Sequence, residues 1–269
     1  MRRFSAFSIP YFLWLGLFAV LPLFLMVVLS FLNSNGMNLS GASFSLDAFT
    51  RLADPAILKA LLNSLYVAAM TVVLCILIGY PTAYFLSFGP FKQKKLLLLL
   101  LILPMWSNSM LRIVSWLRLF SVPWLVPLNA LGSYWAVILV SVATYLPFMV
   151  FPIYTVLEKM DRSLIEASRD LGLPAPKTFF KVTLPLSMKG VYSGIIMVFL
   201  PTATGFAISE AIGEGKIRMF GNLLEGVFKQ NNYNFGSLLS LLVSILLIAL
   251  MAIFDRLQDG KKKGEKKHA

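Results

Sequence analysis

The sequence has almost none of the residues that build metal centres and most hydrolytic active sites. It holds one cysteine, Cys75, and one histidine, His268. A lone cysteine excludes a disulfide framework and a cysteine metal cluster. A lone histidine beside a run of lysines excludes Ser/His/Asp and Cys/His catalytic sets. The Gly-x-x-x-x-Gly-Lys-Ser/Thr phosphate loop is also missing, so we expect no enzyme, no metal and no cofactor on this chain.

Charge is scarce as well, and long apolar runs take its place. Charged residues make up 13% of the chain and hydrophobic residues 58%, unlike a soluble protein. The segment at about 33–60 has too few apolar residues for a core of its own. We predict an all-α membrane protein forming one domain, residues 1–269. Its six spans of about 20 residues are placed at 10–32, 62–88, 96–119, 134–157, 190–210 and 236–256.

The net charge of +12 is unevenly distributed. Of the 24 Lys and Arg residues, 17 lie before the first span, at 89–95, at 158–189 and from Arg256 onward, and five lie in the alternate loops. This asymmetry predicts cytoplasmic termini and a cytoplasmic loop at 158–189. The basic tail, about 257–269, contacts anionic lipid or serves as a disordered topology anchor. No basic face carries interleaved aromatics, so we expect no nucleic-acid binding.

The loop at 158–189 is a polar island between apolar runs. Ser163 and Glu166 have the spacing of a capping box at a helix start. Gly172 stands where a left-handed residue ends a helix, and Pro174 prevents its continuation. Pro176 then suits the first turn of a second short helix, residues 177–184.

This island resembles the EAA loop of ATP-binding-cassette importer permeases. The matching residues are Glu166, Ala167, Gly172, Leu184 and Pro185, with Ser168 for the usual second Ala and Val182 for the usual Ile. The resemblance implies a type I importer permease fold, with a coupling helix that docks on a separate ATPase subunit. The alternative is an ordinary capped amphipathic helix on a cytoplasmic loop.

The third predicted span is unusually polar. Pro104 breaks the helix ladder, and Ser107, Asn108, Ser109 and Arg112 follow within eight residues. Lipid offers such groups no partners, so the cluster must face protein or water. Ionisable residues in a span are functional candidates by default. We expect Arg112 to pair with a carboxylate or to cap carbonyls.

The same stretch is similar to the spermidine/putrescine branch of these permeases, in particular to its B subunits. The segment 103–116 carries the Leu-Pro, Trp, small polar and Arg residues of that branch. The second half agrees through 146–150, 158–161, 200–201 and 209–210. The stretch between Arg118 and the fourth span looks shorter than in the relatives.

A polyamine is a flexible polycation, which needs carboxylates and aromatic faces along its route. The resemblance offers Glu210, predicted to end the fifth span, with Trp106, Asn108 and Tyr145 as further pathway candidates. The alternative is that Glu210 pairs with Lys216 or Arg218. Pro81 predicts a kink in the second span, for gating or for packing alone.

The resemblance implies a permease subunit of a bacterial inner membrane importer. Its expected partners are two ATPase subunits, which carry ATP and Mg²⁺, a homologous second permease and an extracytoplasmic solute-binding protein. The expected substrate is spermidine or putrescine. Two alternatives stay open: an ATP-driven importer of an amino acid or sugar, and a secondary transporter, although no inverted repeat is evident.

Overall fold

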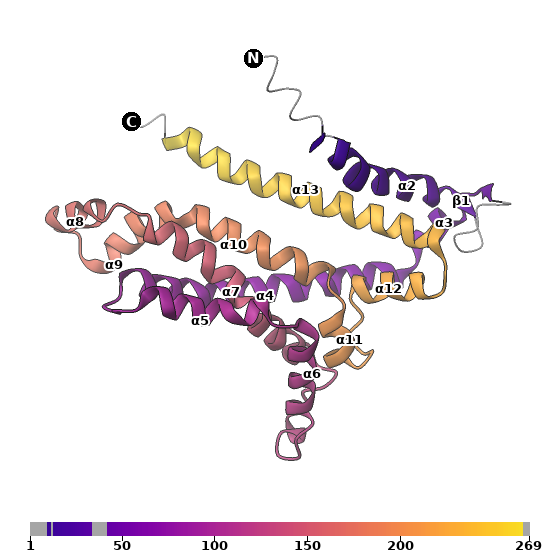
Figure 1. Cartoon of the computed structure of the whole chain (residues 1–269), viewed down its shortest axis with the longest axis horizontal. Helices are drawn as coiled ribbons and strands as arrows, with labels where there is room; N and C mark the ends of the chain where they lie inside the picture. The colour runs from indigo at the N-terminus through magenta and orange to yellow at the C-terminus, as the bar shows by residue number, and fades with distance from the viewer. Residues whose placement is uncertain (1–9, 12, 34–41, 266–269) are drawn as a thin grey trace, which may run out of the picture. The chain divides into compact units, whose positions relative to one another are not determined.

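The computed structural model describes residues 10–11, 13–33 and 42–265 (Figure 1). The side chains of the basic tail, about 257–269, lie outside the described part, so its expected lipid contact stays a prediction. The chain forms two compact units, one of residues 1–59 and 223–250 and one of residues 60–222 and 251–269. The expectation of a single domain also stays a prediction. Three helices contribute to both units: α4 (Pro55–Phe88), α12 (Phe220–Lys229) and α13 (Tyr233–Glu265).

In the first unit, a hairpin connects the first span to the second. The segments are η1 (Gly16–Val20), α2 (Leu21–Ser30), β1 (Leu32–Asn33), β2 (Ser43–Phe44), α3 (Asp47–Thr50) and η2 (Arg51–Ala53). The strands are antiparallel, with Leu32 opposite Phe44. Asn234 at the start of α13 donates from Nδ2 to the main-chain oxygens of Leu29 and Ser30, both at 3.1 Å. It thereby satisfies carbonyls that the end of α2 leaves free.

The second unit is built around α7 (Tyr134–Glu158), in which Met149, Ile153 and Leu157 are fully buried. The other segments of this unit are α5 (Lys94–Trp106), α6 (Ser109–Phe120), η3 (Val126–Leu128), α8 (Ser163–Asp170), α9 (Ala175–Thr178), η4 (Phe179–Thr183), α10 (Leu184–Thr204) and α11 (Ala207–Gly213), of which α5, α6, α10 and α11 pack on α7. Helix α10 approaches α7 so closely that a Cβ added at Gly190 would lie 2.8 Å from the carbonyl oxygen of Pro152. Small residues permit such backbone contacts between membrane helices.

Within the described residues, five helical segments are long and apolar enough to span a membrane, or six if one bent pair counts as a span. These are Leu13–Ser30, Pro55–Phe88, Tyr134–Glu158, Ala175–Thr204, Tyr233–Ile253 and the bent pair α5–α6. The helical membrane fold is therefore confirmed. Pro81 lies inside α4, and the kink expected there stays a prediction.

The third span, expected over 96–119 with its helix ladder broken at Pro104, is interrupted a few residues later. Helices α5 and α6 meet at 89°, with the break at Ser107 and Asn108. At 1.5 Å per residue the 13 residues of α5 cover about 20 Å, short of a hydrocarbon core of about 30 Å. Pro104 does not itself break the helix, because α5 continues two residues beyond it.

The fifth span also differs from the expected 190–210. The helix runs without interruption from Ala175 to Thr204, stops at Gly205, and is followed by the separate helix α11. Glu210 therefore does not end the span but lies in α11. The second short helix expected at 177–184 does not exist as a separate element, since it is the first part of the span.

Candidate functional site

The loop at 158–189 is called here the EAA-like loop. Its first helix, α8, ends where expected, but the start of α8 is capped differently from the prediction. Gly172 has φ +81°, and its N–H donates to the carbonyl oxygen of Arg169 at 2.8 Å. The left-handed stop is thus confirmed. The capping box is wrong: the N-cap of α8 is Arg162, without a side-chain cap. The Asp161 carboxylate instead accepts from the Ser163 N–H at 3.0 Å, and this bond holds the Asp161 pKa below its usual range.

The EAA-like loop has two arms: the first is α8 with the residues just before it, and the second is the helical segment that begins at Ala175. A buried hydroxyl pair joins them. Ser168 Oγ lies 3.1 Å from Thr178 Oγ1 and 2.9 Å from the carbonyl oxygen of Ile165, and its one proton is shared between these two acceptors. Both side chains of the pair are buried. Ser168 occupies the position where the family pattern has alanine, and no local pattern predicts that Thr178, ten residues further along the chain, contacts it.

The second arm passes directly into α10 and contacts α4. Val182 lies in the π-helical turn η4, and Leu184 and Pro185 begin α10. Pro185 has no N–H and its ring crowds the carbonyl four residues earlier, which explains the wider turn before it. The ring of Phe179 meets those of Tyr80 and Tyr84 edge-on, at centroid distances of 5.6 and 5.5 Å.

The first arm also reaches α4. The Ser87 carbonyl oxygen, in the last turn of α4, accepts from Lys94 Nζ at 2.6 Å and from Arg162 Nη2 at 3.5 Å. The Arg162 guanidinium lies 5.9 Å from the Phe88 ring centroid. Cations suit a helix C-terminus, where carbonyls lack helical partners. Both arms of the loop are therefore tied to one membrane helix.

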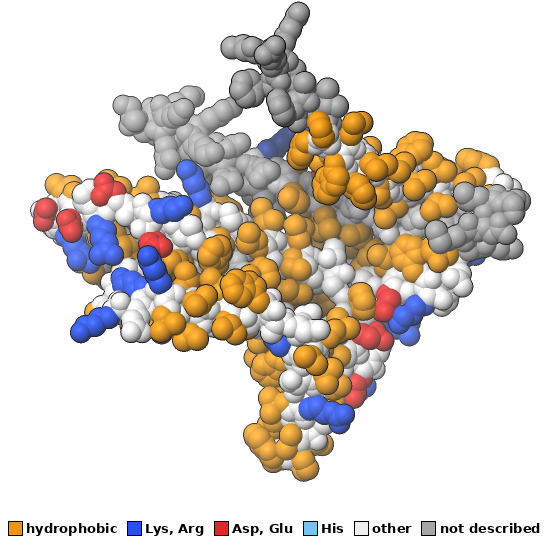
Figure 2. Space-filling view, in the orientation of Figure 1, with side chains coloured by type: hydrophobic (Ala, Val, Ile, Leu, Met, Phe, Trp, Pro, Cys, Tyr) orange, Lys and Arg blue, Asp and Glu red, His pale blue; other side chains and the backbone are white. Residues whose placement is uncertain are grey.

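The exposed side chains of the loop combine charge with apolar groups. Lys, Arg, Asp and Glu side chains gather over α8, while apolar side chains dominate the middle of the helices (Figure 2). Glu166 and Ala167 are exposed on α8. Leu164, Leu171 and Phe180 are 47%, 83% and 64% exposed. Large apolar groups exposed on a polar loop indicate an interaction surface.

The polar cluster of the third span lies at the break between α5 and α6. Asn108 caps α6 by accepting from the Met110 N–H at 2.8 Å. Trp106 is 78% exposed beside the break. The Nε and Nη1 atoms of Arg112 are buried and have no hydrogen-bond partner among the described residues. The carboxylate or carbonyl expected for Arg112 is therefore not found within the described part of the chain.

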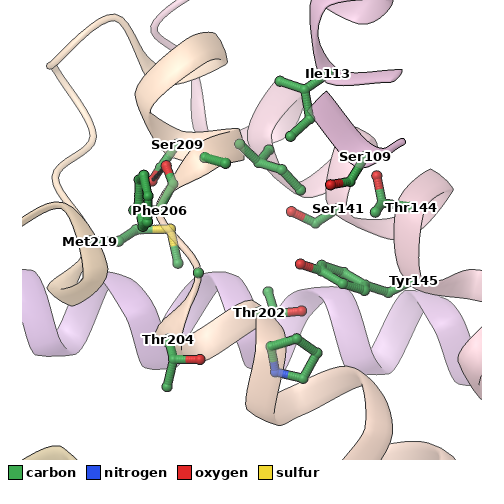
Figure 3. A pocket seen from close by; sticks show the side chains of 14 residues that line it. Ser109, Ile113, Ser141, Thr144, Tyr145, Thr202, Thr204, Phe206, Ser209 and Met219 are labelled. Carbon is green, nitrogen blue, oxygen red and sulfur yellow. Dashed lines mark hydrogen bonds between the residues drawn. The ribbon is translucent and has the colours of Figure 1, made fainter. Parts of the chain in front are cut away.

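A cavity of about 250 Å³ lies between α6, α7 and the break after α10 (Figure 3). Tyr145 is the only one of the four predicted pathway residues among its lining residues. Seven of its fourteen lining residues carry hydroxyl groups. The hydroxyls of Ser109, Ser141, Thr144 and Tyr145 gather on one side, opposite Phe206 and Met219 (Figure 3). The hydroxyl cavity, as we call it, contains no ionisable carboxylate in its lining.

Glu210 lies near the hydroxyl cavity but does not line it. The exposed Glu210 carboxylate accepts from Asn222 Nδ2 at 2.8 Å, and Asn222 Oδ1 accepts from the Ser209 hydroxyl at 2.6 Å. Lys216 lies 3.9 Å from Glu214. No ion pair of Glu210 with Lys216 or Arg218 occurs among the described residues.

Comparisons with known proteins place these features in a family. Residues 3–260 match the family described as the binding-protein-dependent transport system inner membrane component. The chain belongs to this family. The spermidine/putrescine transport system permease protein PotB of Escherichia coli (strain K12) is 35% identical over 257 residues, covering 90% of this chain and 93% of the relative. PotB of Haemophilus influenzae is 33% identical over 258 residues, covering 91% and 90%.

More distant matches agree on the architecture. A PotC homolog from Mycoplasma genitalium is 26% identical over 266 residues, covering 94% of this chain and 92% of the relative. The crystal structure of a bacterial ABC transporter involved in the import of the acidic polysaccharide alginate matches with a TM-score of 0.67 and 18% identity. That match covers 96% of this chain and 98% of the other, and at this identity it shows the fold alone.

As an inner membrane component of a binding-protein-dependent transport system, the chain is a transport subunit and not an enzyme. Sequence reasoning missed most of the hydroxyl cavity. Ser141 and Thr144 stand three residues apart on the predicted fourth span, a spacing that puts them on one helix face. That signal was available, but nothing in the sequence indicated that Ser109 of α6 would lie on the same cavity wall.

Proposed function

We propose that this chain is one of two permease subunits of an ATP-driven importer of spermidine and putrescine. Two ATPase subunits, carrying ATP and Mg²⁺, bind the EAA-like loop, and an extracytoplasmic binding protein delivers the solute. The observation that carries the proposal is identity of 33–35% over nine-tenths of the chain to two permeases named for spermidine and putrescine. Membership in a binding-protein-dependent family supports the partner set.

The geometry of the EAA-like loop supports the coupling role. Its exposed apolar side chains, including Leu171 and Phe180, suit insertion into a cleft of an ATPase. The bonds of Arg162 and the ring contacts of Phe179 connect the loop to α4. ATPase closure then moves the loop, and the loop moves α4 and α10 together. Alternating access follows by rigid-body motion of these helices.

The pathway residues are proposed with different roles. Tyr145 lines the hydroxyl cavity, where its ring can face an ammonium group. Trp106, Asn108 and Glu210 are exposed near the helix breaks, and we propose that they guide the polycation before it reaches the cavity. Arg112 and the prolines Pro81 and Pro104 are proposed to shape the helices that move. The alternative substrates, an amino acid or a sugar, have no such support from the relatives' names.

The test of the function is uptake by the assembled importer in cells that lack their own polyamine importers. Labelled spermidine and putrescine accumulate, while a labelled amino acid and a labelled disaccharide do not. Accumulation of the amino acid or the sugar without the polyamines contradicts the proposal.

The proposed orientation places both termini and the EAA-like loop in the cytoplasm of a bacterium. Single cysteines test it in a Cys75→Ala background, which removes the buried thiol of α4 and leaves the introduced cysteine as the reacting group. Asn232→Cys reacts with an impermeant thiol reagent added to intact cells, whereas Gln93→Cys does not. The reverse labelling pattern would show that the topology is inverted. The EAA-like loop would then lie on the side of the membrane opposite to the ATPase.

A further inference from the structure

The hydroxyl cavity has an excess of hydrogen-bond acceptors. A hydroxyl has one proton to donate and two lone pairs. Ser141 donates to the Val137 carbonyl oxygen at 2.7 Å, and Thr202 donates to that of Val198 at 2.7 Å. Thr204 likewise donates to the Leu200 carbonyl oxygen at 2.8 Å. Because the proton of each is used within its own helix, each of the three oxygens offers only lone pairs to the cavity.

Thr144 adds an unsatisfied polar atom to the same wall. Thr144 is 6% exposed, yet its Oγ1 has no hydrogen-bond partner in the described part of the chain. A buried hydroxyl without a partner costs free energy, and the cavity beside it, of about 250 Å³, has room for a guest. Ser141 and Thr144 stand about 10–15 Å along α7 from Tyr134, inside the span. Because Ser141 and Thr144 are lining residues, this wall of the cavity lies at membrane depth.

We propose that the hydroxyl cavity binds one primary ammonium group of the solute during its passage. This inference rests on the proposed function and names the site and the chemistry of its ligand. An ammonium has three donors and no acceptor, which complements a wall of lone pairs. The Tyr145 ring and hydroxyl oxygen complete the lining around the ammonium group. The hydroxyl oxygen extends toward the break after α10, where it lies 3.8 Å from a Cβ built on Gly205.

The charge near this wall sets how tightly the site can hold its guest. Arg112 interacts electrostatically with Tyr145 but does not line the cavity. Its positive charge opposes a cation, and no lining carboxylate balances it. The site is consequently weak. Weak binding suits a transport pathway, where the solute must leave as readily as it enters.

Spermidine uptake by the complete importer in proteoliposomes, at saturating loaded binding protein, tests the site. Thr144→Val keeps the branched shape and removes the hydroxyl, so the uptake rate falls about five- to tenfold. Thr144→Ser keeps the hydroxyl and the rate. The matched control is Thr71→Val, because Thr71 is also a fully buried threonine with an unpartnered Oγ1 but does not line the cavity. That variant transports at the wild-type rate.

Two results overturn the ammonium site. One is equal uptake by the Thr144→Val and Thr71→Val importers, and the other is an equal loss in Thr144→Ser and Thr144→Val, which assigns the effect to packing. Variants are compared at equal complex yield and equal basal ATP hydrolysis, so a folding defect is recognised separately. Failure of the wild-type importer to carry spermidine is a different result, since it contradicts the proposed function itself.

Discussion

The EAA-like loop and the hydroxyl cavity both form where helices stop, but the stops are built differently. In the loop, α8 ends through one residue, Gly172, in a left-handed conformation at φ +81°. At the cavity, α5 and α10 end at Ser107 and Gly205, both in extended conformations. A left-handed stop is encoded locally because most other residues avoid it. An extended stop is open to any residue, so its position depends on the surroundings.

The two cavity stops share a further feature. Each follows a Leu-Pro pair, and the proline carbonyl oxygen accepts the closing bond, from Ser107 N–H at 3.2 Å and from Gly205 N–H at 2.9 Å. Packing then fixes the second stop, since a Cβ on Gly221 would lie 2.4 Å from the Thr204 carbonyl oxygen. Substitutions in the loop should therefore act through backbone conformation. Substitutions at the cavity should act through close packing and polar contacts.

The largest effect is expected at the loop stop. Gly172→Pro cannot adopt φ +81° and loses the N–H bond to Arg169. Uptake falls to background although the subunit still inserts, because the loop no longer fits the ATPase. Gly172→Asn is the matched control, as asparagine tolerates the left-handed region, and it keeps most of the uptake. Normal transport with Gly172→Pro would show that the left-handed stop is dispensable.

An effect of about an order of magnitude is expected at Glu210. The variant Glu210→Gln keeps the shape but loses a charged contact to a passing ammonium, worth roughly 1.5–3 kcal/mol, and each 1.4 kcal/mol corresponds to about tenfold in rate. Glu214→Gln is the control, because that exposed carboxylate contacts Lys216 instead. If the main role of Glu210 is its hydrogen bond with Asn222, the Glu210→Gln importer keeps its uptake and the melting temperature of the complex falls.

A smaller effect is expected from close packing beside the cavity. Gly221→Ala places its Cβ against the carbonyl oxygens of Thr204 and Gly205, and such overpacking costs about 1–3 kcal/mol. The melting temperature of the purified subunit falls and uptake drops a few-fold. Gly226→Ala on the same helix meets no atom within 4 Å and leaves both unchanged or slightly improved. Equal melting temperatures for the two variants contradict the packing account of this stop.

The smallest effect is expected at Ser168. Ser168→Ala restores the usual family residue and removes the bond to Thr178, which contributes about 1 kcal/mol. We expect a modest loss of thermal stability and less than a twofold change in uptake, because Gly172 still sets the turn. Thermal unfolding and uptake measured on one preparation check this. A tenfold loss of uptake would make the hydroxyl pair a main part of the coupling.

The comparison also explains how much the sequence could predict. The membrane class, the spans at the chain's apolar runs and the left-handed Gly172 follow from local signals. The predicted capping box does not form, because the carboxylate of Asp161, two residues before Ser163, caps the start of α8 instead. The break in the third span is predicted at Pro104 but lies at Ser107 and Asn108, because α5 accommodates the proline and continues to Trp106 before the backbone turns by 89°.

The cavity was beyond sequence reasoning for a different reason. Its wall combines Ser109, Ser141 and Thr202 from three separate helices, and only the packing of α6 and α10 on α7 brings them together. Tyr145 was identified from its aromatic character. Thr144 was missed, because an isolated threonine on an apolar span gives no sign that its hydroxyl lacks a partner.

The most direct test of the account is ATP-dependent accumulation of labelled spermidine by proteoliposomes that contain this chain, its second permease and two ATPase subunits. With the loaded binding protein outside and ATP available to the ATPases, spermidine accumulates, and Gly172→Pro abolishes accumulation without preventing insertion. Accumulation that proceeds without ATP, or transport of a sugar or amino acid in place of spermidine, contradicts the account.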